Sequence, residues 1–257
     1  AMRWRAAHAV RRLAEIERFD VLDKLTARFD SGSGLPFSDA KLPFYPMHAQ
    51  LWLLIALARV SKDNPGGLAP HRQFFERVAL SSEFPHVVMR ASAIDTLREI
   101  SRLLDPAESQ VLLSAISAVN VSPYDHNPKT SYTELRYAER PKSSPRPENA
   151  FYFDYDFDKY QLERLCQVFA RPGWEVKDQI NGWVRRWDKS VSGMHECPRT
   201  STYDDTWSSG YVPDRDPYGG YLGWHALMLV AGELLASLPV VGDDWCGDAW
   251  SAFLNEY

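Results

Sequence analysis

The sequence predicts an all-α protein in which a stack of helical hairpins, an α-solenoid, is followed by a helical but loop-rich C-terminal half. One pattern of small and branched apolar residues recurs three times within residues 1–120, and each copy is followed by a second amphipathic segment. Self-similarity at a fixed period is the sequence signature of helical repeats, because each repeat buries its apolar face only by stacking on a neighbour. Beyond residue 120, prolines interrupt the helical periodicity until residue 150.

The repeated pattern is a helical stripe at offsets 0, 3, 7 and 10 from its first residue. It begins at Arg3, His48 and Arg90, so successive copies start 45 and 42 residues apart. The first and third copies, RWRAAHAVRRLAEI and RASAIDTLREISRL, align without a gap, and HAQLWLLIALA shows the same offsets about midway. The stripe predicts which residues are buried between helical layers: Ala6, Val10, Leu13, Leu51, Ile55, Ala93, Leu97 and Ile100.

Each copy is followed by a second segment with helical periodicity. These segments are VLDKLTARF, LAPHRQFFERVAL and PAESQVLLSAISAV, which start at residues 21, 68 and 106. Asp105 and Pro106 supply an N-cap and a first-turn proline for the third segment, since Asp is favoured as a cap and Pro at the first helical position. A hairpin of two helices is therefore the expected repeating unit.

The segment PHVVMRASAIDTLREI, residues 85–100, resembles the second-helix signature of HEAT repeats, in which a basic residue precedes the apolar positions. The spacing between copies also matches the roughly 40 to 47 residues of HEAT or armadillo units. This resemblance covers residues 3–119 and implies a HEAT-like α-solenoid.

The chain as a whole is similar to the C-terminal helical region of large bacterial proteins that carry a NACHT or related STAND-type ATPase. The similarity implies a bacterial parent protein that is an ATPase switch in antiviral defence, with a sensed ligand protein as its partner. The sequence has no GxxxxGK[ST] loop, so we expect no ATPase activity from this chain. Ala1 before Met2 indicates a cloning remnant, and the helical pattern already runs at Arg3, so we expect the chain to be part of a longer protein.

The chain divides by sequence pattern into three regions. We predict helical repeats in residues 1–120, a loop or linker in residues 121–150, and a helical, aromatic-rich region in residues 151–257. Five prolines and little apolar periodicity mark the linker.

The C-terminal region contains four helical patterns. They predict helices that begin by Lys159 and after Pro172, a long helix over residues 218–238, and a last helix over residues 243–257. Residues 188–217 show no regular pattern. On the long helix, the residues predicted to be buried are Leu222, Ala226 and Leu229.

Composition and charge limit the partners. The formal net charge of -5 and the pI near 5.8 argue against nucleic-acid binding through the overall field, although Arg3, Arg5, Arg11 and Arg12 form a local basic strip. No apolar run reaches the ~20 residues that span a bilayer, and we expect no secretion signal. The odd number of widely spaced cysteines fits a reducing compartment. We therefore expect a cytoplasmic protein that binds neither membranes nor nucleic acid.

A calcium loop is the first potential metal site. Asp154, Asp156 and Asp158 match its opening, but an EF-hand needs Gly at its sixth position and Glu at its twelfth, where this chain has Lys159 and Leu165. We interpret the aspartates as solvent-facing residues and as an N-cap for the following helix.

A zinc site is the second potential metal site. Its possible ligands are His195, Cys197, Cys166, Cys246 and His225. No C-x-x-C pair is present, and Cys166 and Cys246 fall in amphipathic helices, where cysteine is usually a small core residue. We therefore expect no bound metal or other cofactor, and three free and mutually distant cysteines.

His225 is the candidate for acid–base chemistry, with Asp204, Asp205 or Glu233 as the acid that would orient its ring. The alternative is a half-buried histidine that is hydrogen-bonded to a loop carbonyl. No Ser or Cys lies in a nucleophile-elbow motif, so we expect no enzymatic activity.

The segment TYDDTWSSGYVPDRDPYGGY, residues 202–221, is the most unusual part of the chain, because it concentrates aromatic rings, aspartates and glycines. Aromatic rings with polar tips are favoured at interfaces, but a long loop can equally fold back and use its rings as its own anchors. Under the interface hypothesis the binding residues are Trp207, Tyr211, Tyr218, Tyr221, Trp224, His225, Asp204 and Asp205.

The sequence thus favours a protein-interaction or ligand-sensing module, whose partner is another protein or a sensed ligand. Two alternatives remain. One is an enzyme with a pocket between the two halves that uses His225 and the acids of residues 204–216. The other is a structural spacer or oligomerisation segment, and the sequence does not indicate the oligomeric state.

Overall fold

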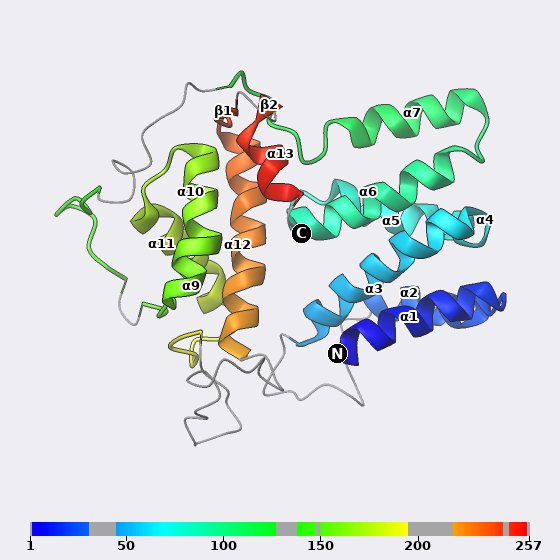
Figure 1. The fold of residues 1–257 in the computed structure, drawn as a ribbon, viewed down its shortest axis with the longest axis horizontal. Helices are drawn as coiled ribbons and strands as arrows, with labels where there is room; N and C mark the ends of the chain where they lie inside the picture. The colour runs from blue at the N-terminus through cyan, green and yellow to red at the C-terminus, as the bar shows by residue number, and fades with distance from the viewer. Residues whose placement is uncertain are drawn as a thin grey trace. The chain divides into compact units, whose positions relative to one another are not determined.

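The computed structural model describes residues 2–30, 45–126, 138–147, 150–194, 218–243 and 247–255 (Figure 1). These residues are mainly helical and their strands are two residues long, so the all-α prediction is confirmed. The chain divides into two compact units, unit 1 (Ala1–Val121) and unit 2 (Ser122–Tyr257). Within the described residues, no helix is both long and apolar enough to cross a membrane.

Unit 1 has helices wherever the sequence predicts the two members of a hairpin. Asp105 caps the last of them as expected, because its Oδ1 accepts hydrogen bonds from the amides of Ala107 and Glu108 at 3.0 and 2.9 Å. In chain order the elements are α1 (Met2–Glu15), α2 (Phe19–Asp30), α3 (Tyr45–Asp63), α4 (Pro65–Leu68), the 3-10 turn η1 (Ala69–His71), α5 (Arg72–Leu80), α6 (Val87–Ser101) and α7 (Pro106–Ser117).

The first helices of the three hairpins, α1, α3 and α6, lie side by side and run in the same direction (Figure 1). Ion pairs join their C-terminal ends in turn: Arg11 of α1 lies 2.7 Å from Asp63 of α3, and Lys62 of α3 lies 3.0 Å from Glu99 of α6. The first helices of successive hairpins therefore contact each other in turn.

The second helices of the hairpins contact one another through single pairs of side chains. The rings of Phe29 in α2 and Phe74 in α5 meet edge to face at 5.0 Å, and Asp23 of α2 pairs with His71 of η1 at 2.9 Å. Arg72, at the start of α5, lies 3.6 Å from Glu108 at the start of α7. Each second helix thus contacts its counterpart in the next hairpin.

The predicted apolar stripe is largely buried in α3 and α6. Leu51, Ala93, Leu97 and Ile100 are buried as expected, whereas Ile55 is partly exposed. Both helices pack against neighbours on more than one side, so their buried faces are broader than one stripe.

In α1 the predicted stripe is wrong. Ala6 is exposed and Val10 and Leu13 are partly exposed, while the buried residues are Ala7 and Ala14. A shift of one residue turns a helix face by about 100°, so the offsets can repeat while the helix is rotated. The methyl groups of alanine allow α1 to lie close against α3.

Unit 2 is built around one long helix, α12, most of whose residues are buried. Leu222, Ala226 and Leu229 are fully buried there, which confirms the sequence expectation. In chain order the elements are α9 (Tyr155–Phe157), the π-helical turn η2 (Asp158–Leu162), α10 (Glu163–Phe169), α11 (Gly173–Trp187), α12 (Tyr218–Ser237), β1 (Gly242–Asp243), β2 (Gly247–Asp248) and α13 (Ala249–Leu254).

One predicted boundary in unit 2 is confirmed and another is wrong. The chain is helical by Lys159, as predicted, and the helical structure starts at Tyr155, because Asp154 caps it by accepting a hydrogen bond from the Phe157 amide at 2.6 Å. The last helix begins at Ala249 instead of residue 243, because β1 and β2 first form an antiparallel pair. The predicted N-cap role of an aspartate in this stretch is confirmed.

The start of α12 packs directly on the backbone of another segment. Tyr152 and Gly193 form a parallel β-bridge, in which the Tyr152 amide donates to the Ser192 carbonyl at 2.7 Å. A Cβ placed on Gly219 would lie 1.9 Å from the carbonyl oxygen of Gly193. Only glycine allows α12 to approach this bridge so closely.

Candidate interaction surfaces

The aromatic residues predicted to bind a partner fall into two groups. Trp207 and Tyr211 lie outside the described residues, as do Asp204 and Asp205. The other four predicted residues, Tyr218, Tyr221, Trp224 and His225, are on α12.

The α12 residues are mostly enclosed. Tyr218 and His225 are fully buried and Tyr221 is buried, while Trp224 is partly exposed. Tyr218, Tyr221 and His225 therefore belong to the packed interior, since their side chains are enclosed by the protein. Of this group, only Trp224 has surface that a partner can reach in this structure.

The described residues do not bring His225 together with its proposed acid Glu233. The two residues are eight positions apart on one helix, which separates them by about 12 Å along its axis. Glu233 is exposed and accepts a hydrogen bond from the Trp183 indole at 3.1 Å. The ring of His225 instead lies edge-on to the ring of Trp224, at 4.9 Å.

The potential metal ligands that the structure describes have structural roles. Asp154 is a helix cap, and Asp158 pairs with Lys177 at 2.5 Å. Cys166 is buried in α10, where burial raises the pKa of its thiol to about 12. His195, Cys197 and Cys246 lie outside the described residues; among the residues described, no three His, Cys, Asp or Glu side chains are arranged to hold a metal.

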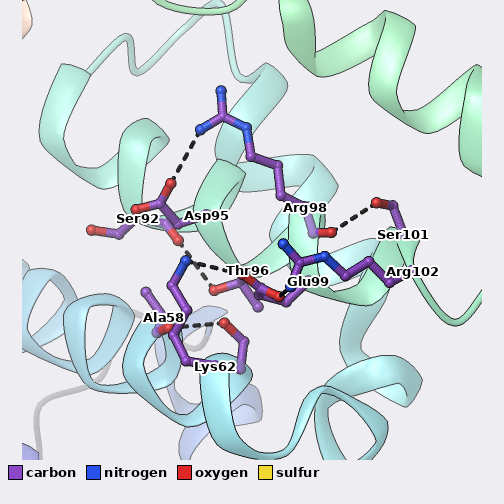
Figure 2. Close-up of polar contacts among 10 residues, drawn as sticks. Ala58, Lys62, Ser92, Asp95, Thr96, Arg98, Glu99, Ser101 and Arg102 are labelled. Carbon is purple, nitrogen blue, oxygen red and sulfur yellow. Dashed lines mark hydrogen bonds and ion pairs between the residues drawn. The ribbon is translucent and has the colours of Figure 1, made fainter.

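A charged seam, formed by Lys62, Glu99 and Arg102, joins α3 to α6 (Figure 2). The Glu99 side chain is only 7% exposed and accepts hydrogen bonds from Lys62, at 3.0 Å, and from Arg102. The hydrogen bond from Lys62, together with the charges of both cations, lowers the pKa of Glu99. The sequence analysis missed this seam, because its two helices are far apart in the chain.

Small polar residues line the same two helices. The hydroxyl groups of Ser61, Thr96 and Ser101 each donate to a carbonyl of their own helix, at 2.8, 3.1 and 2.8 Å (Figure 2). These buried hydroxyls are therefore satisfied without a partner from the facing helix. At the rim Lys62 and Arg102 remain well exposed, and they offer cationic donors to solvent or to an acidic partner.

His86 caps α6 and is fully buried. Its Nδ1 accepts a hydrogen bond from the Met89 amide at 3.3 Å, and its ring stacks on Phe84 at 6.0 Å. Burial lowers the pKa of His86 to about 3, so the ring is neutral. The sequence analysis missed this cap, because histidine is not among the common N-cap residues.

Unit 2 carries an exposed tyrosine–lysine surface, formed by Tyr155, Lys159 and Tyr160. The Lys159 ammonium lies 5.5 Å from the Tyr155 ring and 5.2 Å from the Tyr160 ring. The two tyrosines are 63% and 48% exposed. A cation between two aromatic faces is an attractive arrangement, and π-helical turns such as η2 are frequent at functional sites. The aromatic run from residue 151 to residue 160 is the sequence signal that could have identified this surface.

No protein-family model matches the chain, and no curated protein sequence matches it either.

Proposed function

We propose that the chain is a protein-interaction module in which HEAT-like hairpins form an α-solenoid. The parallel row of α1, α3 and α6, joined by the Arg11–Asp63 and Lys62–Glu99 ion pairs, is the observation that supports this proposal most strongly. Stacked hairpins that contact each other in turn are the building principle of repeat proteins, which present extended surfaces to other macromolecules. The partner is another protein or a ligand that the bacterial, cytoplasmic parent protein senses.

Unit 2 supplies the aromatic contacts in this proposal. Tyr155 and Tyr160 combine exposed rings with polar hydroxyl groups, the chemistry that is enriched in binding hot spots. Trp207 and Tyr211 are also aromatic residues that carry a polar N–H or O–H group, and they belong to the same proposed set. The full burial of His225 supports a binding role over the enzymatic alternative, because a general base must reach its substrate.

Affinity capture with the full chain tests the proposal. We expect the double variant Tyr155→Ser/Tyr160→Ser to retain at least about tenfold less partner protein, since the loss of two hot-spot rings costs well over 1.4 kcal/mol. Its melting temperature should stay close to that of the parent chain, because surface substitutions change stability by about 0.5 kcal/mol or less. Trp207→Ala and Tyr211→Ala should behave in the same way.

Tyr124→Ser is the matched control, because Tyr124 is also an exposed tyrosine of unit 2 but lies outside the tyrosine–lysine surface. The control should bind as the parent chain does. If all of these variants captured the same proteins in the same amounts, the aromatic surface would have no role in binding. A chain that captured no protein but formed a stable oligomer in size-exclusion chromatography would support the spacer alternative.

A further inference from the structure

The tyrosine–lysine surface already holds a cation between its rings. The Lys159 ammonium lies 5.5 Å from the centre of the Tyr155 ring and 5.2 Å from that of the Tyr160 ring. Both distances are within the ~6 Å over which an aromatic face attracts a positive charge. From these contacts we infer that the surface receives an arginine or lysine side chain from a basic segment of the partner protein, and that Lys159 occupies this position until the partner displaces it. The inference rests on the proposed function, since it names the chemistry of the partner that binds there.

Lys159 can be displaced because the two rings hold it by weak contacts. A neighbouring lysine shows the difference: Lys177 lies 5.7 Å from the Phe153 ring and also pairs with the Asp158 carboxylate at 2.5 Å. Among the described residues of unit 2, no carboxylate pairs with Lys159. An exposed cation–π contact changes an equilibrium constant by only about two- to fivefold. Lys177 is therefore fixed in place, whereas Lys159 can leave its position at little cost.

The rings are open to a partner. Tyr155 and Tyr160 are 63% and 48% exposed, and Tyr152, which precedes them in the same aromatic run, is 65% exposed. A guanidinium group is planar and stacks on aromatic faces, while an ammonium group acts as a compact point charge. Rings exposed to this extent have surface that a cationic side chain of another protein can reach.

The charge around the rings favours a basic partner. Residues 152–163 contain four acidic residues and one basic residue, Lys159, so the segment has three more negative than positive charges. Asp156, in the middle of this segment, is exposed. A negative field attracts a basic segment and repels an acidic peptide or a nucleic acid. A cationic side chain thus complements both the rings and the carboxylates.

Fluorescence anisotropy tests the inference with a labelled peptide of alternating arginine and glycine, titrated with the full chain at low salt. Lys159→Ala should bind this peptide at least about twofold more tightly, because the competing ammonium is gone. Tyr155→Ser/Tyr160→Ser should bind it about five- to thirtyfold more weakly, since two cation–π contacts are lost. Tyr155→Phe/Tyr160→Phe should bind as the parent chain does, because phenylalanine keeps the ring face.

Lys142→Ala is the matched control for the loss of a positive charge. Lys142 is an exposed lysine of unit 2 that lies outside the tyrosine–lysine surface, so its removal changes the net charge equally. This variant should gain less affinity for the peptide than Lys159→Ala. An equal gain from both substitutions would show an effect of overall charge and would overturn the inference.

Three other results would contradict a basic partner. One is weaker peptide binding by Lys159→Ala, which would show that the lysine itself binds an anionic group. Another is tighter binding of a peptide of alternating glutamate and glycine than of the arginine peptide. The third is no measurable binding of the arginine peptide to the parent chain or to Lys159→Ala. These results do not depend on the tyrosine variants, so they decide the matter even if a double variant fails to fold.

The same variants separate this inference from the proposed function. If Tyr155→Ser/Tyr160→Ser lost the captured partner protein and Lys159→Ala lost it too, the aromatic interaction surface would stand and the cationic partner would be wrong. If no aromatic variant lost the partner protein, the proposed function would fail, and the inference about its partner would fail with it.

Discussion

The central helices of the two units, α6 and α12, are both enclosed, but they are enclosed by different means. Among the residues buried on α6 are the polar Ser92, Thr96 and Glu99; the Thr96 hydroxyl donates to the Ser92 carbonyl within α6, whereas Glu99 pairs with Lys62 of α3. The buried residues of α12 are almost all apolar, and Gly219 brings its first turn against the backbone of Gly193. The stability of a helix that is held by a charged pair depends on the protonation of that pair. The stability of a helix that is held by close apolar packing depends on the volume of its side chains.

The largest expected loss of stability comes from truncating a buried leucine, and it should be the same in both helices. Leu97→Ala in α6 and Leu229→Ala in α12 should each lower the free energy of unfolding by about 2 to 5 kcal/mol, because both leucines are fully buried and their truncation leaves a cavity. Urea denaturation of the full chain measures this. Leu103→Ala is the control, since Leu103 is half exposed and should change stability by about 0.5 kcal/mol or less. A loss confined to one helix would show that the other is loosely packed.

An increase in side-chain volume should destabilise the protein most at the start of α12. Gly219→Ala should destabilise unit 2 by about 1 to 3 kcal/mol, because the new methyl group would collide with a backbone oxygen that cannot rotate away. Gly182→Ala is the matched control in α11, where a Cβ would meet nothing within 4 Å. That substitution should stabilise the protein by about 0.5 to 1 kcal/mol, because alanine favours the helix interior. Thermal unfolding curves distinguish the expected loss of stability in Gly219→Ala from the expected gain in Gly182→Ala. A Gly219→Ala variant as stable as the parent chain would contradict the close approach of Gly219 to the Gly193 carbonyl.

Of the two helices, only α6 should lose stability when the charge of a glutamate is removed. Glu99→Gln should cost about 1 to 3 kcal/mol at pH 7, because Lys62 and Arg102 lose their shared carboxylate. Since the pKa of Glu99 is lowered in the folded chain, its stabilisation is present above the ordinary carboxylate range and is lost as the pH falls below it. The difference between variant and parent should therefore shrink in urea denaturation at pH 4.

Glu233→Gln in α12 is the counterpart of that variant, because Glu233 is exposed and bonds only at the surface. It should change stability by about 0.5 kcal/mol or less at either pH. Equal losses from both substitutions would remove the distinction between the two helices.

Local sequence patterns were enough to predict the helices and several of their ends. Asp105 and Asp154 both cap helices, as their residue type and position indicate, because a cap is made by atoms two or three residues apart. The helical periodicity of α12 likewise predicted the burial of Leu222, Ala226 and Leu229. The tyrosine–lysine surface depends on the π-helical turn η2, which the pattern did not reveal.

What the sequence by itself determined was thus helical content, the hairpin period and the local caps, since each depends on neighbours within a few turns. Only the tertiary structure decided that α1 buries Ala7 and Ala14 instead of the predicted stripe, and that Lys62 meets Glu99. It also decided that the carbonyl of Gly193 lies over Gly219. These features depend on how far each helix rotates and how closely it approaches a distant segment, and a periodic pattern carries no information about either quantity.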